Sequence, residues 1–183
     1  MQFRQLAAAV AAVIVIAAST SPASRDVLAS ARSTGTNGGG NFLLLNTIDA
    51  SFNFNAVRTG DGGAEGNFFQ SFIFQGQLVE FRGRVTCFAV DAENHRAWIG
   101  GVVTENNSTH PNFTTPRTQP GRDVWFRVLD GGEGSGAEPD RTTIYGFEGD
   151  REIITSEQYC AARLWLAGNA NTFPVTDGNI QVR

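Results

Sequence analysis

The residues best placed to do chemistry are four carboxylates on one glycine-rich loop. Asp130, Glu133, Glu138 and Asp140 supply the hard oxygen ligands that calcium requires. Their spacing matches neither the EF-hand loop nor the RTX nonapeptide. Two interpretations stay open. The loop forms a calcium site, which predicts a melting temperature that rises with calcium, or it is a hairpin loop whose acids aid solubility.

Hydrolytic catalysis by serine and histidine needs a base within hydrogen-bond reach of the nucleophile. The chain has two histidines, His95 and His110, and both lie in polar loop sequence. The run Gly134-Ser135-Gly136 lacks the Gly-x-Ser-x-Gly spacing of a nucleophile elbow. No spacing favours a pair of carboxylates for glycoside hydrolysis. We therefore predict a protein that is not an enzyme and that has no cofactor, calcium excepted.

The two cysteines, Cys87 and Cys160, predict a single disulfide if the chain is exported to an oxidising compartment. Such a bond is worth about 4 kcal/mol in the chain-entropy model. Two free buried thiols are the alternative. The count and spacing exclude a CxxC redox pair and a cysteine-rich zinc site.

Charge and hydropathy indicate where the protein resides. The 183 residues carry 14 basic side chains, all arginine, and 18 acidic ones, for a net charge of −4. This balance excludes a polybasic nucleic-acid binder. The apolar run 6–18 follows Arg4 and is too short to span a bilayer, so it predicts a signal peptide over 1–23, with cleavage as late as 31 as the alternative. We expect no membrane segment after cleavage and a secreted, periplasmic or extracellular location.

The elements that must position these residues are short strands. Residues 24–44 are predicted to be a flexible glycine-rich leader, and 45–183 a β domain. The clearest strand is 78–90, where Val79, Phe81, Val85 and Cys87 share one parity; this alternation predicts a buried face that includes Cys87. It forms a hairpin with 97–104.

Later segments follow the same logic. A second hairpin is predicted between 123–130 and 141–148, and a last strand over 179–183 after a turn at Asp177-Gly178. Residues 157–166 have the spacing of a short helix. The fold class is therefore all-β, a single antiparallel β-barrel or β-sandwich of about eight strands, in which the disulfide ties the 149–178 connection to the sheet.

Several blocks also resemble a family of small secreted bacterial all-β proteins of no known activity. The blocks are VTCFAVDAENHRAWIGGVV (85–103), VWFRVLDGGEG (124–134), Pro139-Asp140, Cys160 and GNIQVR (178–183). The resemblance covers roughly 45–183. It departs from the family pattern in a longer turn after Val90 and in Gly-Gly after Asp130. It implies secretion, an all-β fold and the disulfide, and it transfers no catalytic residue.

Three functions remain open. The first is a secreted non-catalytic β module with a structural or adhesive role at a cell surface. The second is a binder of a small apolar ligand inside a barrel, suggested by the phenylalanine-rich strands. The third is a module stabilised by calcium through the loop 130–140. The chain also has glycosylation sequons at Asn106, Asn107 and Asn112. They predict a glycosylated surface loop in a eukaryotic host and a loop without sugar in a bacterial one.

Overall fold

The computed structural model describes residues 34–149, 153 and 155–183. The predicted signal peptide and residues 24–33 of the predicted leader lie outside the described residues. The elements are β1 (Gly35–Leu44), β2 (Ile48–Arg58), β3 (Ala64–Phe74), β4 (Gln77–Asp91), β5 (Arg96–Asn106), the 3₁₀ helices η1 (Pro111–Phe113) and η2 (Pro116–Thr118), β6 (Asp123–Leu129), β7 (Arg141–Thr142), β8 (Gly146–Phe147), α1 (Ser156–Ala162) and β9 (Phe173–Val182).

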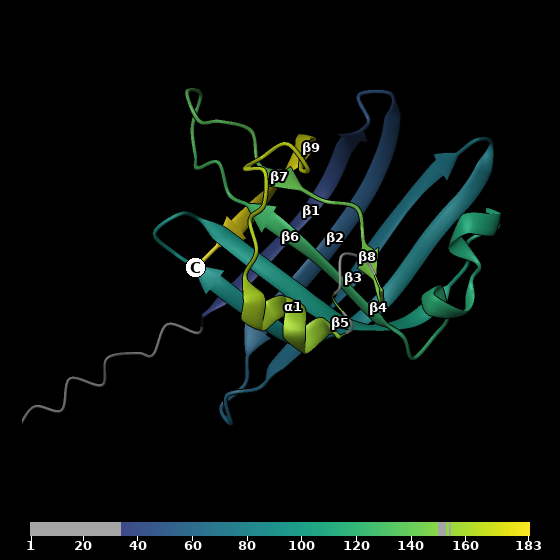
Figure 1. The fold of residues 1–183 in the computed structure, drawn as a ribbon. Coiled ribbons are helices and arrows are strands. Elements are labelled where there is room, and N and C mark those ends of the chain that lie inside the picture. The colour runs from purple at the N-terminus through teal and green to yellow at the C-terminus, as the bar shows by residue number, and fades with distance from the viewer. Residues whose placement is uncertain (1–33, 150–152, 154) are drawn as a thin grey trace, which may run out of the picture. The chain divides into compact units, whose positions relative to one another are not determined.

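The strands form a closed antiparallel barrel, as Figure 1 shows. Their order is β5-β4-β3-β2-β1-β9-β7-β6, and pairing of β5 with β6 closes the ring. β8 pairs with the same edge of β6 as β7 does, further along, so β7 and β8 are two pieces of one barrel strand. The structure thus confirms the all-β fold class and resolves the choice between barrel and sandwich.

The inside of the barrel is filled by aromatic rings. Alternation along the strands turns one face inward, and the buried rings there include Phe54, Phe68, Phe126 and Tyr145. Their centroids lie 5.2–5.9 Å apart, the range of favourable aromatic pairs. Gly83 leaves the space for one ring, because a Cβ there would lie 1.8 Å from Cζ of Phe68. An eight-stranded barrel is just wide enough for such side chains to fill.

The predicted flexible leader is wrong for residues 35–44, which form β1. This strand pairs with β2 from Gly35 to Leu44 and with β9 from Thr36 to Phe42. Glycine and asparagine have low strand propensity, but neighbours on both sides satisfy the backbone groups of β1. Pairing on both sides thus outweighs local propensity.

The prediction that Cys87 lies on the buried inner face is also wrong. A β-bulge between Val85 and Cys87 inserts Thr86 and reverses the side-chain alternation of β4. Val85 and Phe88 belong to the core, whereas Cys87 pairs with Gly100 on the outer face. The hairpin of β4 with β5 is confirmed.

Three boundaries differ from the sequence prediction. The strand expected over 141–148 is broken at 143–145. The last strand begins at Phe173, and the expected turn at Asp177-Gly178 lies inside it. The helix ends at Ala162, because Arg163 adopts a left-handed conformation with φ 47°.

Candidate functional site

Helix α1 packs on the outside of the barrel wall, against β4, β5 and β6 (Figure 1). Cys160 in α1 and Cys87 in β4 form a disulfide, with their sulfur atoms 2.12 Å apart. At the start of the helix, the amide and the hydroxyl of Ser156 both donate to Oδ1 of Asp123, at 2.8 and 2.7 Å. Gly100 allows this close approach, because a Cβ there would lie 2.8 Å from Cβ of Ser156.

The chain after α1 follows the same wall and is held through its carbonyl groups. Trp98 Nε1 donates to the carbonyl of Leu164 at 2.9 Å, and the guanidinium of Arg127 donates to Leu164 at 3.1 Å and to Leu166 at 3.5 Å. Trp98 and Arg127 are buried although they point out of the barrel. The 163–172 segment therefore forms a second layer over β5 and β6.

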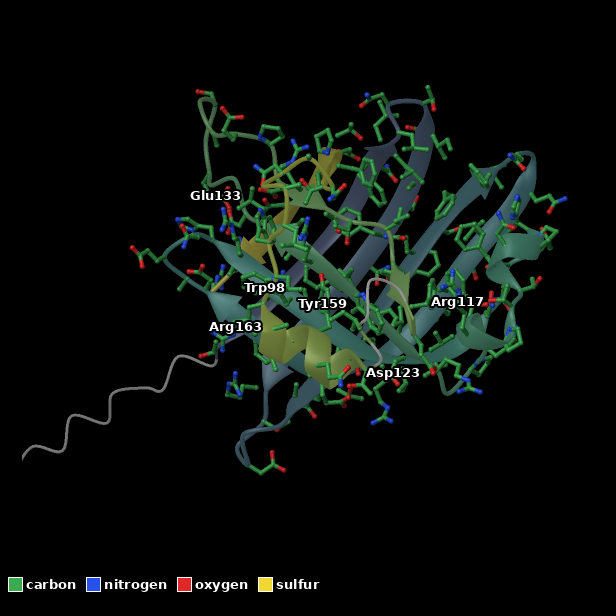
Figure 2. The ribbon with its side chains drawn as sticks, in the orientation of Figure 1. Trp98, Arg117, Asp123, Glu133, Tyr159 and Arg163 are labelled. Carbon is green, nitrogen blue, oxygen red and sulfur yellow. A yellow bond between two sulfur atoms is a disulfide. The ribbon has the colours of Figure 1, made fainter. Side chains whose placement is uncertain are left out.

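A pocket of about 590 Å³ lies between this layer and the wall. Its floor is formed by Trp125 and Arg127 of β6 and by the segment 143–146, and its other side by Tyr159 of α1 with Leu164 and Leu166. The ring of Tyr159 stacks on Trp125 with centroids 5.6 Å apart. Figure 2 labels Tyr159 on helix α1. We call this hollow the helix pocket.

The lining of the helix pocket is mainly apolar. Five large hydrophobic side chains are exposed among the described residues, and four of them line it: Leu45 at 61%, Ile144 at 37%, Leu164 at 39% and Leu166 at 49%. Its volume falls within the range of small-molecule sites, about 300–1,000 Å³. Exposed apolar groups gathered in one hollow indicate a binding site rather than scattered surface.

The break between β7 and β8, which forms part of the floor, is held by a buried glutamine of β3. Gln70 Nε2 donates to the carbonyl of Thr143 at 3.1 Å, and its Oε1 accepts from the amide of Tyr145 at 3.2 Å. A side chain thus replaces the strand partner that these backbone groups lack. Burial raises the pKa of Tyr145 well above 10, because its ring lies in the core.

The four acidic residues of the loop 130–140 do not converge on one point. Asp140 accepts from the amides of Gly131 at 2.8 Å and Ile180 at 2.5 Å, and Asp130 from Gly132 at 2.9 Å and Val182 at 3.1 Å. Glu133 accepts from the Asn179 side chain at 3.3 Å, and it lies on the loop away from α1 (Figure 2).

Asp140 is buried, unlike Glu133 and Glu138, which are exposed. Burial raises the pKa of Asp140, the two backbone donors oppose this, and the charges of Asp130 and Glu133 add to the rise. Within the described residues, no three side chains of His, Cys, Asp or Glu are grouped as metal ligands. Calcium binding by Asp130, Glu133, Glu138 and Asp140 stays a prediction.

The histidines have structural contacts. His110 is buried against Phe74, with ring centroids 4.9 Å apart, and its Nδ1 accepts from the amide of Asn112. Nε2 therefore carries the proton and faces Oε1 of Gln75 at 3.2 Å. His95 occupies the β4–β5 turn with φ 53°.

The three sequons differ in their surroundings. Asn106 Nδ2 donates to the carbonyls of Phe113 and Thr118, so its amide nitrogen is already bonded. Asn107 Nδ2 donates to Oε1 of Glu80. Asn112 is exposed.

Sequence reasoning missed the residues that build the helix pocket. Trp125 and Arg127 alternate with the core residues of β6, and nothing in the sequence of this strand indicates that a second layer covers them. Gln70 had a signal, since it is the polar residue between Phe68 and Phe72 on the inward parity of β3.

Comparison of the chain with protein-family models, curated proteins and solved structures gave no match. The resemblance drawn from the sequence blocks therefore stays a prediction. No helix among the described residues is long and apolar enough to cross a membrane.

Proposed function

We propose that this chain is a secreted, non-catalytic β-barrel module that acts by binding, and that the helix pocket takes a small apolar molecule. The observation that carries the proposal is the gathering of four exposed hydrophobic side chains in one hollow. The disulfide between Cys87 and Cys160 supports export to an oxidising compartment.

The place of the ligand follows from the packing. Aromatic rings fill the barrel interior, whereas the space outside the wall is bounded on both sides and lined by side chains of Leu, Ile, Trp and Tyr. Removing such surface from water contributes about 25 cal/mol per Å². A ligand that covers Leu45, Ile144, Leu164 and Leu166 therefore gains most of its affinity from burial.

The non-catalytic part of the proposal is supported by the hydrogen bonds of the acidic and histidine side chains, which hold the fold together. Asp130 and Asp140 bind backbone amides of β9, and Asp123 binds the first turn of α1. His110 caps η1. Each of these groups has a role in the fold.

The test is binding of the neutral fluorescent probe N-phenyl-1-naphthylamine to the folded chain and to two matched variants. Leu166→Glu places a charge in the helix pocket. Ile73→Glu places the same charge on a side chain that is 55% exposed and outside it. We expect Leu166→Glu to weaken the affinity for the probe tenfold or more, and Ile73→Glu to leave this affinity unchanged. Equal affinity in both variants, or no probe binding, would contradict the proposal.

A further inference from the structure

The outer surface of β9, β1, β2, β3 and β4 presents three rows of aligned side chains, which we call the polar face. The rows are set by the strand register. They are Gln181-Asn37-Asn55-Asn67-Arg84, Asn179-Gly39-Asn53-Phe69-Arg82 and Asp177-Asn41-Ser51-Ser71-Glu80.

Side-chain amides are the largest group on the polar face, and its charges cancel. Seven of its side chains are amides, and its two arginines, Arg82 and Arg84, are balanced by Glu80 and Asp177. Asn37, Asn53 and Asn67 are exposed, and their side-chain amides bond to no other described residue. Each therefore offers water one acceptor and two donor hydrogens.

Strand stability does not explain this composition. Asparagine and glycine are depleted in strands, where Thr, Val and Tyr fit better. Residues that go against local strand propensity without a structural gain are expected at functional or strained sites. Closure of the barrel also removes the sheet edges, so these residues are not needed to block edge-to-edge pairing.

We propose that the polar face binds a neutral polysaccharide. The hydroxyl groups of such a chain both donate and accept hydrogen bonds, which matches rows of amides spaced by about 4.8 Å, the distance between paired strands. An acidic polymer requires a net positive surface, and the core of a protein interface requires a larger apolar area than one aromatic ring provides.

Phe69 is the aromatic side chain at the centre of the polar face. It is half-buried between Asn53 and Arg82 in the middle row, and the guanidinium carbon of Arg82 lies 4.8 Å from its ring centroid. Arg82 is in turn held by Glu80 at 3.8 Å and Glu105 at 3.6 Å. A sugar ring can pack its C–H groups against Phe69 while the flanking amides bind its hydroxyls.

Affinity electrophoresis of the purified chain tests the proposal, with hydroxyethylcellulose, dextran and mannan as neutral probes and heparin as the charged one. The test variant is Asn37→Thr/Asn53→Thr, which improves strand propensity. Its matched control is Asn112→Thr, an exposed asparagine outside the polar face. Phe69→Ala tests the contribution of the aromatic ring, and thermal melting confirms that each variant is folded.

We expect at least one neutral polysaccharide to retard the chain. The double threonine variant and Phe69→Ala should then bind tenfold more weakly, with Asn112→Thr and Leu166→Glu unchanged. The last comparison separates the polar face from the helix pocket. The proposal is overturned if no neutral probe retards the chain, if heparin alone does, or if the double variant binds like the parent.

Discussion

At the scale of single residues, Asp130 and Asp140 take the place of a neighbouring strand along β9. β7 pairs with β9 only at Phe173 and Pro174. Further along, the amides of Ile180 and Val182 point toward the same side and donate to the two carboxylates. Two of the four acids in the loop 130–140 therefore complete the hydrogen bonding of β9. Calcium binding by the loop stays a prediction.

This role predicts the effect of Asp140→Asn. The carboxylate accepts from two backbone amides, whereas a carboxamide has a single oxygen, so one buried N–H loses its partner. We expect the free energy of unfolding to fall by about 1–3 kcal/mol. Urea unfolding measures it, and the exposed Glu138→Gln should cost much less. Similar losses in the two variants would argue against the strand-like role.

At the scale of elements, local alternation decided what could be predicted. The β4–β5 hairpin was predicted because its inward and outward residues alternate over many positions. β1 was missed because Gly and Asn carry no strand signal, and the pairs that make it a strand come from segments distant in sequence. The face of Cys87 was missed because one inserted residue, Thr86, reverses the alternation, and no local pattern marks it.

The seven-residue helix α1 depends on its attachments, since a helix of this length is not stable alone. The disulfide links it to β4 across 73 residues of sequence. Replacing both cysteines by serine should lower the free energy of unfolding by about 2–4 kcal/mol. Hydrogen exchange should rise most in α1 and 163–172.

Peptides from β2 and β3 serve as the internal control for that experiment, because they lie outside the layer formed by α1 and the 163–172 segment. A uniform rise in exchange across α1, β2 and β3 would show that the disulfide supports the whole barrel rather than this layer.

At the scale of the whole molecule, the all-β class was predictable, whereas the choice of a barrel and the helix pocket were not. Alternating strands without long helical periodicity indicate a barrel or a sandwich. The choice between these two depends on whether the first and last strands of the sheet pair, as β5 and β6 do here. The helix pocket unites Leu45 at a turn, Trp125 on β6 and Leu166 beyond α1. Each of these has an ordinary surface or core environment in its own segment, so only the tertiary fold reveals that they line one hollow.

The chain as a whole gives an unusually direct test of how tightly the barrel interior is packed. It has no lysine, and both cysteines are in the disulfide, so apart from tyrosine the unfolded chain has few groups that titrate near pH 10. Burial raises the pKa of Tyr145 well above 10. Above pH 10 the unfolded chain therefore releases a proton that the folded barrel retains, and the free energy of unfolding falls as the pH rises.

The expected slope from this one group approaches about 1.4 kcal/mol per pH unit above pH 10. Urea unfolding of the parent and of Tyr145→Phe between pH 9 and about pH 11.5 measures it, because every other titrating group is common to both proteins. The phenylalanine variant should lose that part of the slope whatever its stability at neutral pH. Parallel pH profiles would mean that the Tyr145 hydroxyl reaches water, and that the ring-filled interior is open beside the break between β7 and β8.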